Sequence, residues 1–341
     1  MSSTRNFEAL RVAVLGDLIA DRYVYATPSR LSREAPVMVL KHRSERFGAG
    51  GAANVAMNLR SLGASVRLFG AVGLDAGGRE LLRMLEDEGV QTSEVQTVRG
   101  YKTPTKTRVL AAEPRRSLQQ VLRIDEEPEA AHGDEVHRTL RDALLRAADE
   151  IDALILSDYE YGCLSKSVGD AARELSSSGT VCVLDPRCNL EDYTGLTALT
   201  PNVGEVARFT GTPAEELDDE DALRVAARKL LEHAQARYLL VTRGNLGMAL
   251  FGDGIDPDGV AVEASGTGEV TDVSGAGDTA AAAFTLALAA GHAPADAMAL
   301  ANAASGVVVM ENGAATCPRA ALDDALGSAP SPVLLGRRDF S

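Results

Sequence analysis

The residue types best suited to chemistry lie late in the chain. Gly275, Ala276 and Gly277 precede a long run of helix formers that stops at Gly291, so they should form the N-terminal mouth of a helix. Free backbone N–H groups at such a mouth suit a phosphate, and glycine lets the backbone come close to it. Asp278 would repel a phosphate there. Its presence is explained if it is a general base for a hydroxyl that attacks the phosphate. On these residues alone, a simple helix cap at Asp278 is an equally good interpretation.

Two further motifs place polar residues at expected helix starts. Gly50 and Gly51 precede the helix that begins near Asn54, which allows a second close approach of backbone to a ligand. Asn202 and Glu205 follow a strand and share one face of a first helical turn, where Glu205 could hold a hydrated Mg²⁺. A glycine turn and a capping box would explain the same two patterns without any ligand.

Carboxylates follow the first expected strand, and basic side chains gather in two irregular segments. Asp17 and Asp21 could bind sugar hydroxyls, although a solvated loop would also account for them. Guanidinium groups suit a phosphate, and alternation puts Lys106 and Arg108 on one face of a strand. Scattered surface charge is the usual explanation for any one such residue. The basic residues considered for an anion site are Arg30, Arg33, Lys102, Lys106, Arg108 and Arg123.

Composition and missing motifs exclude several classes of protein. The 341 residues carry 34 basic and 49 acidic side chains, a net charge of −15, which argues against nucleic acid or an anionic membrane as the main partner. The sequence has no P-loop, no clear dinucleotide fingerprint, no nucleophile elbow and no metal-type histidine pattern. The polar start is unlike a signal peptide, the alanine-rich run is too short for a membrane span, and the four cysteines form no CxxC pair. We therefore expect a reduced cytoplasmic protein that binds neither nucleic acid nor membrane.

Short apolar strands alternate with helical stretches along most of the chain. This alternation predicts an α/β fold with a doubly wound, mostly parallel sheet in three layers. Several strands end in polar residues, and such sheets bind ligands at the carboxyl ends of their strands. The expected strands cover residues 11–15, 66–72, 153–156, 181–184, 196–199 and 238–241, and the expected helices cover 54–62, 78–88, 134–148, 166–176, 221–234 and 280–290.

Two segments, residues 22–42 and 95–124, do not follow this rhythm. They alternate apolar and polar residues and are punctuated by proline, which predicts extra antiparallel strands in a small β-sheet over the site. A stretch with two prolines at residues 328–332 marks the expected end of the fold. We expect one domain over residues 1–330, with the two segments inserted as a lid, and a tail over residues 331–341.

The three helix-start motifs, in this order, resemble the ribokinase-like (PfkB) carbohydrate kinases, and the resemblance covers residues 10–325. Within that family, two further runs are similar to the kinases of D-glycero-β-D-manno-heptose 7-phosphate that serve lipopolysaccharide synthesis. The runs are Ser29-Arg30-Leu31-Ser32-Arg33-Glu34-Ala35-Pro36-Val37 and Thr105-Lys106-Thr107-Arg108-Val109. The resemblance implies ATP-dependent phosphorylation of the anomeric hydroxyl of that sugar phosphate, with Mg²⁺ and with a homodimer formed through the lid. A requirement for a monovalent cation stays open.

The resemblance also implies a role for each matched residue. Asp278 is the expected catalytic base, with the backbone of Gly275, Ala276 and Gly277 as the anion hole. The sugar phosphate is expected at Asp17, Asp21, Arg30, Gly50, Gly51, Asn54, Lys106, Arg108, Arg123, Asp185 and Arg187, with Lys106, Arg108 and Arg123 as candidates for its distal phosphate. The nucleotide is expected at Asn202, Glu205, Arg243, Gly247 and Asn302, with Glu205 on the metal side.

Departures from the heptose kinase pattern bear on the choice of substrate. Tyr161 stands where a lysine is usual, Arg187 replaces a lysine, and Gly48 and Ala49 replace an arginine and a proline. They leave kinase chemistry intact but leave open another acceptor, such as ribose, a ketohexose phosphate or a different heptose phosphate. A protein that senses sugar or nucleotide without catalysis is the alternative of another class. The sequence ends early and lacks the His-x-Gly-His motif of the nucleotidyltransferase in bifunctional relatives, so we expect the kinase activity alone.

Overall fold

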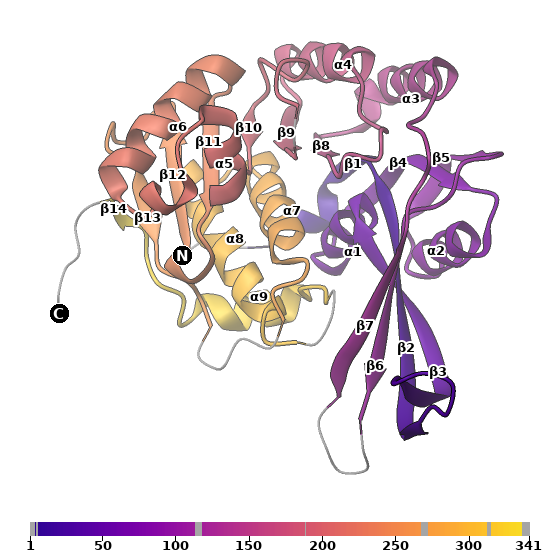
Figure 1. Ribbon diagram of the computed structural model, residues 1–341. Helices are drawn as coiled ribbons and strands as arrows, with labels where there is room; N and C mark the ends of the chain where they lie inside the picture. The colour runs from indigo at the N-terminus through magenta and orange to yellow at the C-terminus, as the bar shows by residue number, and fades with distance from the viewer. Residues whose placement is uncertain are drawn as a thin grey trace.

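The computed structural model describes residues 4, 6–112, 118–187, 189–266, 272–311 and 315–335. In this part of the chain, a large sheet lies between two layers of helices, and a smaller sheet projects from it (Figure 1). The predicted α/β fold with a mostly parallel sheet and a small separate sheet is confirmed. Across the described residues, no helix has the length and apolar character needed to cross a membrane.

The large sheet has ten strands in the order β14-β13-β12-β11-β10-β9-β8-β1-β4-β5. Pairing is parallel from β5 to β11 and antiparallel from β11 to β14. Apolar side chains bury the inner strands on both faces, as expected for a parallel sheet covered by helices. The strands are β1 (Arg11–Gly16), β4 (Ser65–Gly73), β5 (Gln91–Val98), β8 (Ala153–Ser157), β9 (Val181–Asp185), β10 (Ala198–Leu199), β11 (Tyr238–Thr242), β12 (Met248–Gly252), β13 (Val260–Val262) and β14 (Val333–Leu334).

The helices form one layer on each face of this sheet, each with its own hydrophobic core. One layer holds α1 (Ala52–Ser61), α2 (Ala76–Asp87), α7 (Ala276–Ala289), α8 (Pro294–Val308) and α9 (Arg319–Leu326). The other holds α3 (Asp134–Arg146), α4 (Lys166–Ser177), α5 (Val203–Thr210) and α6 (Glu220–Ala234). Single 3₁₀ turns cover Phe7–Ala9, Ala148–Glu150, Ala214–Glu216 and Gly244–Leu246. The residues of α7 are mostly small and apolar, and those from Asp278 to Ala287 are all buried, as expected of a helix enclosed by its neighbours.

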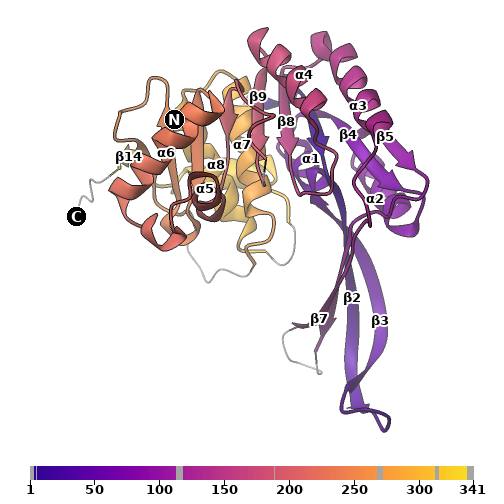
Figure 2. The same cartoon turned by 45° about the horizontal axis from the view of Figure 1, so that its top comes forward.

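The smaller sheet, called the lid from here on, has the strand order β3-β2-β6-β7. Its strands are β2 (Leu18–Leu31), β3 (Met38–Gly51), β6 (Thr105–Ala111) and β7 (Gln119–Glu126). Figure 2 shows the long β2–β3 hairpin extending away from the helices.

Two details of the lid differ from expectation. Residues 95–98 lie in β5, which pairs with β4 at the edge of the large sheet, so the expectation that residues 95–124 belong entirely to the lid is wrong. In addition, β2 and β6 pair in parallel, because a connection that contains α1, β4, α2 and β5 separates them.

One edge of the large sheet carries the root of the lid and the start of α1. β1 ends at Gly16, β2 begins at Leu18, and β3 ends at Gly51, directly before α1. Gly16 is required at this point, because a Cβ there would lie 2.1 Å from the carbonyl oxygen of Ser157, the last residue of β8. The carboxyl ends of the inner strands therefore meet the lid and α1 at one place.

Candidate active site

Asp278 lies in the first turn of α7 and is only 5% exposed. Both of its carboxylate oxygens accept hydrogen bonds: Asn54 Nδ2 donates to Oδ2, and the Tyr159 hydroxyl donates to Oδ1, each at 2.7 Å. Asn54 belongs to α1, and Tyr159 belongs to the loop after β8. Three segments that are distant in the sequence therefore meet at one carboxylate.

Burial raises the pKa of Asp278 to about 6, because the charged carboxylate loses its contact with water. The hydrogen bonds from Asn54 and Tyr159 act in the opposite direction, Asp21 raises the pKa further, and Lys106 lowers it. With a pKa near 6, the carboxylate is ionised at pH 7 and still basic enough to accept a proton. This balance suits a general base.

The mouth of α7 is open in front of this carboxylate. Gly275 is the N-cap residue in the left-handed conformation, with φ 80°, and no side chain caps the helix. Asp278 is therefore not the cap that the sequence left as an alternative. A Cβ added at Gly277 would meet no atom within 4 Å. The N–H of Ala276 donates to the carbonyl of Val273 at 3.3 Å, but the N–H groups that follow it in the first turn have no partner within the helix and are available to an anion.

A pocket of about 110 Å³ lies at this mouth, and the start of α5 lines its other side. Two helix N-termini therefore face one cavity, and the positive ends of both helix dipoles favour phosphate there. The predicted site residues in its wall are Asp185, Arg187, Asn202, Glu205, Gly275, Gly277 and Asp278.

Asn202 and Glu205 form the capping box of α5. The Asn202 side chain accepts from the Glu205 N–H at 3.0 Å, and Glu205 Oε2 accepts from the Asn202 N–H at 2.8 Å. Glu205 Oε1 lies 3.6 Å from Arg187 Nη1. Burial raises the pKa of Glu205, while the backbone hydrogen bond from Asn202 lowers it. The capping box thus holds Glu205 in the pocket wall, and this structural role is compatible with a second one toward a ligand.

The carboxylates in the pocket wall fit a hydrated Mg²⁺. Asp185 ends β9, and its Oδ1 accepts from the Thr200 hydroxyl at 2.8 Å. Burial raises the pKa of Asp185 well above its ordinary value, and the nearby charges of Asp278 and Glu205 add to that shift. Within the described ranges, no group of three or more His, Cys, Asp or Glu forms a metal cage. Mg²⁺ needs few protein carboxylates and keeps several waters, so this wall is compatible with the predicted metal role of Glu205.

Asp17 has a structural role that the sequence did not indicate. Its Oδ2 accepts from the N–H groups of Tyr159 and Tyr161, at 2.8 and 3.0 Å, and its Oδ1 accepts from the N–H of Cys163 at 2.9 Å. Its side chain is buried at 1% exposure. Both oxygens therefore hold the loop after β8, and contact of Asp17 with a sugar hydroxyl stays a prediction.

Gly50 and Gly51 are required by their surroundings. A Cβ at Gly50 would lie 3.0 Å from Asp21 Oδ2, and a Cβ at Gly51, which has φ 59°, would lie 2.5 Å from the carbonyl oxygen of Asp17. The glycine pair thus joins β3 to α1 and brings Asn54 to Asp278. The structure supports the prediction for Asn54 as a site residue, but gives the two glycines a packing role.

The basic residues of the lid differ in what they contact. Arg108 pairs with Asp21, and Arg123 pairs with Asp125. Lys106 has no carboxylate partner among the residues that the structure describes; its Nζ lies 5.7 Å from the centroid of the Tyr159 ring. Burial lowers the pKa of Lys106. Of the three predicted phosphate ligands, Lys106 is therefore the one that lies close to Tyr159 and forms no ion pair among the described residues.

Arg30 does not reach this cluster. It is exposed near the free end of the β2–β3 hairpin, opposite Val39. Nine residues of strand separate Arg30 from Asp21, which is about 30 Å at the rise of an extended chain. The structure therefore does not bring Arg30 to this cluster within one subunit, and its role as a substrate ligand stays a prediction.

Three residues expected at the nucleotide do not line the pocket. The backbone N–H of Arg243 donates to the carbonyl of Gly247 at 2.8 Å. Gly247 has φ 80°, and a Cβ there would lie 2.0 Å from the carbonyl oxygen of Val262. Asn302 Nδ2 donates to the Glu263 carbonyl at 2.8 Å and to Ser265 Oγ at 2.9 Å. These contacts explain Gly247 and Asn302 as residues that hold backbone near the pocket.

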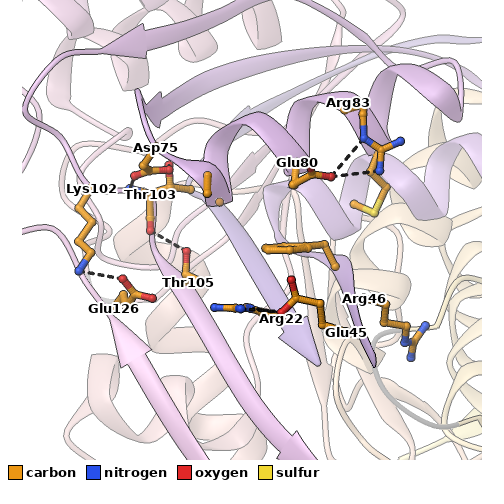
Figure 3. Close-up of a pocket in the computed structure, with 14 residues that line it drawn as sticks. Arg22, Glu45, Arg46, Asp75, Glu80, Arg83, Lys102, Thr103, Thr105 and Glu126 are labelled. Atoms are coloured by element: carbon orange, nitrogen blue, oxygen red, sulfur yellow. Dashed lines mark hydrogen bonds and ion pairs between the residues drawn. The ribbon is translucent and has the colours of Figure 1, made fainter. Parts of the chain in front are cut away.

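A larger hollow of about 740 Å³ lies between α2 and the lid, away from Asp278. Figure 3 shows the charged side chains of α2 and the lid strands around it. Three basic groups pair with acidic groups of the same wall, namely Arg22 with Glu45, Lys102 with Glu126 and Arg83 with Glu80, and Arg46 donates to the Tyr25 hydroxyl. A phosphate would have to break these pairs, so the smaller pocket is the better candidate for the reaction.

The sequence did not single out Tyr159 as a site residue. The contact of Tyr159 with Asp278 spans 119 positions in the sequence. The remaining pocket residues that were not predicted are Asp158, Pro186, Thr200 and Thr242. All of them follow or end a strand, so the position of polar residues after strands was the available signal.

Comparisons with known proteins relate the chain to one family and to two kinds of solved structure. Residues 9–321 match the family described as pfkB family carbohydrate kinase. The chain is 38% identical over 326 residues to the bifunctional protein HldE of Desulfatibacillum aliphaticivorans, which covers 95% of this chain and 64% of that protein. The bifunctional protein HldE of Escherichia fergusonii is also 38% identical, over 323 residues, with 94% and 64% covered. The chain thus spans 64% of the length of these relatives.

Two solved structures share the fold. Ribokinase of Arabidopsis thaliana, solved with ribose and ATP, has a TM-score of 0.70 at 22% identity, with 93% of this chain and 98% of that chain covered. Phosphofructokinase-2 of Escherichia coli, solved with substrates and products, has a TM-score of 0.73 at 20% identity, again with 93% and 98% covered. The ribokinase-like fold is therefore confirmed.

Proposed function

This chain belongs to the pfkB family of carbohydrate kinases, and we propose that it transfers the γ-phosphoryl group of ATP to the anomeric hydroxyl of D-glycero-D-manno-heptose 7-phosphate. The products would be ADP and the 1,7-bisphosphate. One observation carries the proposal. A buried carboxylate, Asp278, lies at an open helix mouth in a pocket that a second helix N-terminus also faces.

The proposed reaction sets the acceptor hydroxyl against Asp278, with the γ-phosphorus in line beyond it. As the new O–P bond forms, the hydroxyl proton passes to the carboxylate. The bond between the γ-phosphorus and the ADP oxygen breaks, and ADP leaves with the electron pair. The N–H groups at Gly275 to Gly277 would stabilise charge on the transferred phosphoryl oxygens. Asn54, fixed to Oδ2, keeps the base from turning away.

Mg²⁺, when bound, would neutralise charge on the nucleotide phosphates. Glu205 and Asp185 are the residues of this chain that we expect to hold it, on the evidence of their place in the pocket wall. Replacing K⁺ by a bulky organic cation in the same assay tests whether a monovalent cation is required: a loss of activity would show that it is.

Lys106 is the cation that we propose for the phosphate at the far end of the sugar. It lies on the lid, above the ring of Tyr159, and the hydroxyl of that ring touches the base. A sugar that spans from Asp278 toward the lid would bring its distal phosphate to Lys106. Arg108 and Arg123 already have carboxylate partners, so we expect a smaller contribution from them.

The choice of heptose 7-phosphate rests on the two runs at residues 29–37 and 105–109, which resemble the heptose kinases. A second candidate, another sugar phosphate such as a ketohexose phosphate, is favoured by Tyr161, which stands where those kinases usually have lysine. The Tyr161 hydroxyl donates to Glu127 Oε1 at 3.1 Å, at the exit of the lid. This contact places an acidic rather than a basic group on that side of the site.

A substrate panel tests the proposal. The full chain is assayed with ATP, Mg²⁺ and equal concentrations of heptose 7-phosphate, ribose and fructose 6-phosphate, with ADP release as the measurement and ³¹P NMR to identify the product. We expect kcat/KM for heptose 7-phosphate to exceed the others by about 100-fold or more. A higher value for either other sugar would contradict the acceptor. Thermal stabilisation by ligands without ADP release would indicate a binding protein instead.

We also propose a homodimer through the lid, working in the cytoplasm where ATP is available. Leu122 and Ile124 lie two residues apart on β7, so they share one face of the strand, and they are 53% and 50% exposed. An apolar face of this kind is suited to a second copy of the chain.

A further inference from the structure

Tyr159 donates a hydrogen bond to the carboxylate of Asp278 from the side of the pocket. Its hydroxyl lies 2.7 Å from Oδ1, and its ring lies beneath the lid at Lys106. Tyr159 lines the same pocket as Gly277, whereas Asn54, the donor to Oδ2, does not. An acceptor hydroxyl in this pocket would therefore approach Oδ1, the oxygen that Tyr159 already contacts.

The loop that carries Tyr159 is held firmly. The carboxylate of Asp17 accepts from its N–H groups at Tyr159, Tyr161 and Cys163. Between the first two, Glu160 has φ 65°, a left-handed conformation that a residue with a side chain adopts only where its surroundings enforce it. The backbone around Tyr159 is thus fixed, and the ring has little freedom to leave the base.

We propose that Tyr159 is a positioning residue of the phosphoryl transfer, whose hydroxyl keeps Asp278 Oδ1 directed at the acceptor hydroxyl during the reaction. The inference rests on the proposed role of Asp278 as base. A carboxylate oxygen has two lone pairs, so Oδ1 can accept from Tyr159 and from the acceptor at once. With Asn54 on Oδ2, both ends of the carboxylate are fixed, and the free lone pair keeps its direction.

The same hydrogen bond also sets how basic Asp278 is. Donation to the carboxylate stabilises its charged form and so opposes the effect of burial on the pKa. The other charged groups that face Asp278 are Asp21 and Lys106 on the lid and Asp185 at the end of β9. A Tyr159→Phe change leaves all of them in place, so a change of the pKa in that variant reports the lost hydrogen bond.

The test compares two variants of one loop. Tyr159→Phe keeps the ring and removes the hydroxyl that contacts Asp278. Tyr161→Phe is the matched control, because it removes a hydroxyl that contacts Glu127. The dependence of kcat on pH is measured for both variants and for the wild type, with whichever sugar the wild type phosphorylates best. The phosphates of the substrates titrate alike in all three enzymes, so only the differences count.

We expect Tyr159→Phe to lower kcat by about 10-fold and to move the acid limb of the profile upward by about half to one pH unit. Tyr161→Phe should leave the limb at the wild-type pH. A lower kcat with an unmoved limb would reduce Tyr159 to a packing role. An unchanged kcat with a lower KM for the sugar would mean that the hydroxyl only occupies the place of the acceptor. Either result overturns the inference.

The outcomes separate this inference from the proposed function. If heptose 7-phosphate is rejected while another sugar is phosphorylated and the limb still moves, the acceptor was wrong and the role of Tyr159 stands. If heptose 7-phosphate is phosphorylated and the limb does not move, the function stands and the role of Tyr159 fails. Thermal midpoints of both variants equal to that of the wild type would show that neither change disturbs the fold.

Discussion

At the scale of single residues, Asp278 must be ionised for catalysis, although its burial destabilises the ionised form. Burial disfavours its charged form and raises its pKa to about 6, while a general base must be charged to accept a proton. Hydrogen bonds from Asn54 and Tyr159 recover part of that free energy. The site should therefore reduce the stability of the protein at neutral pH.

We expect Asp278→Asn to be more stable than the wild type at pH 8 but not at pH 4. The folded-state pKa of about 6 lies above the ordinary value of 3.8, so between these values the folded state binds more protons than the unfolded state. The free energy of unfolding of the wild type therefore falls by up to roughly 3 kcal/mol as pH rises through this window, and it levels off above pH 6. Thermal unfolding of both proteins at pH 4 and pH 8 measures the difference in stability between the variant and the wild type. The same difference at both pH values would contradict the raised pKa.

Lys106→Met should weaken the binding of a phosphorylated sugar. The change removes a half-buried charge from the lid while keeping the length of the side chain, and a hydrogen bond to a charged group contributes about 1.5–3 kcal/mol, so KM should rise by roughly 10- to 100-fold. Lys102→Met is the control, because Lys102 pairs with Glu126 at the larger hollow. Equal KM values for the two variants would argue against Lys106 as the phosphate ligand.

The sequence could single out Asp278 and Asn54 as candidates, because each follows glycines at the expected start of a helix. That local pattern can be recognised without knowing which distant residues lie nearby in the fold. It could not decide the role of Asp17 or Gly51. A carboxylate after a strand looks the same whether it meets a sugar or the N–H groups of a loop. A glycine before a helix looks the same whether a ligand or the carbonyl of Asp17 fills the space of its Cβ.

At the scale of elements, the site is built from the starts of three helices. α1 brings Asn54, α5 brings its capping box, and α7 brings the open mouth and the base. The N-termini of α5 and α7 face one pocket, so their dipoles add where phosphate would bind. Helix starts thus supply the positive potential that the acidic chain otherwise lacks.

Gly277→Ala should reduce activity without loss of stability. Its Cβ would enter open space at the mouth of α7, where a phosphoryl group is proposed to lie, so we expect kcat/KM to fall by about 10-fold or more. Alanine is a better helix former than glycine, by up to about 1 kcal/mol, so the thermal midpoint should stay level or rise. Full activity in a stable variant would show that no ligand approaches this backbone.

The alternation of strands and helices was sufficient to predict the parallel sheet, since each expected strand overlaps a strand of the structure. The short antiparallel strands β13 and β14 were not expected, because two or three residues of pairing leave little periodicity to detect. The antiparallel strand β12, which pairs over five residues with β11, was not expected either. β5 was assigned to the lid, because an edge strand exposed on one side alternates like a lid strand. The sequence could not show that Arg30 lies near the free end of the β2–β3 hairpin, because residue types do not reveal how far a hairpin extends.

At the scale of the whole molecule, two sheets share one junction, and the lid projects from it with little cover of its own (Figure 2). An isolated sheet of this length leaves apolar residues exposed, among them Leu122 and Ile124. This arrangement supports the proposed dimer through the lid.

Ile124→Glu should convert the proposed dimer to a monomer, because a charge would be buried at the apolar face. Val225→Glu is the control, since Val225 is 67% exposed on α6, on the body of the molecule. Sedimentation velocity at several protein concentrations distinguishes a monomer from a dimer for the wild type and for each variant. A monomeric wild type, or a dimeric Ile124→Glu, would contradict an interface through this face of the lid.

The most direct test of the central claim is the turnover of Asp278→Asn with the best sugar acceptor, together with the nucleotide Kd of the same variant. Asparagine keeps the shape of the side chain and cannot accept the proton. We predict that kcat falls by about 10²- to 10⁴-fold while the nucleotide Kd stays within about 3-fold of the wild-type value. A variant that retains near wild-type kcat would contradict the account.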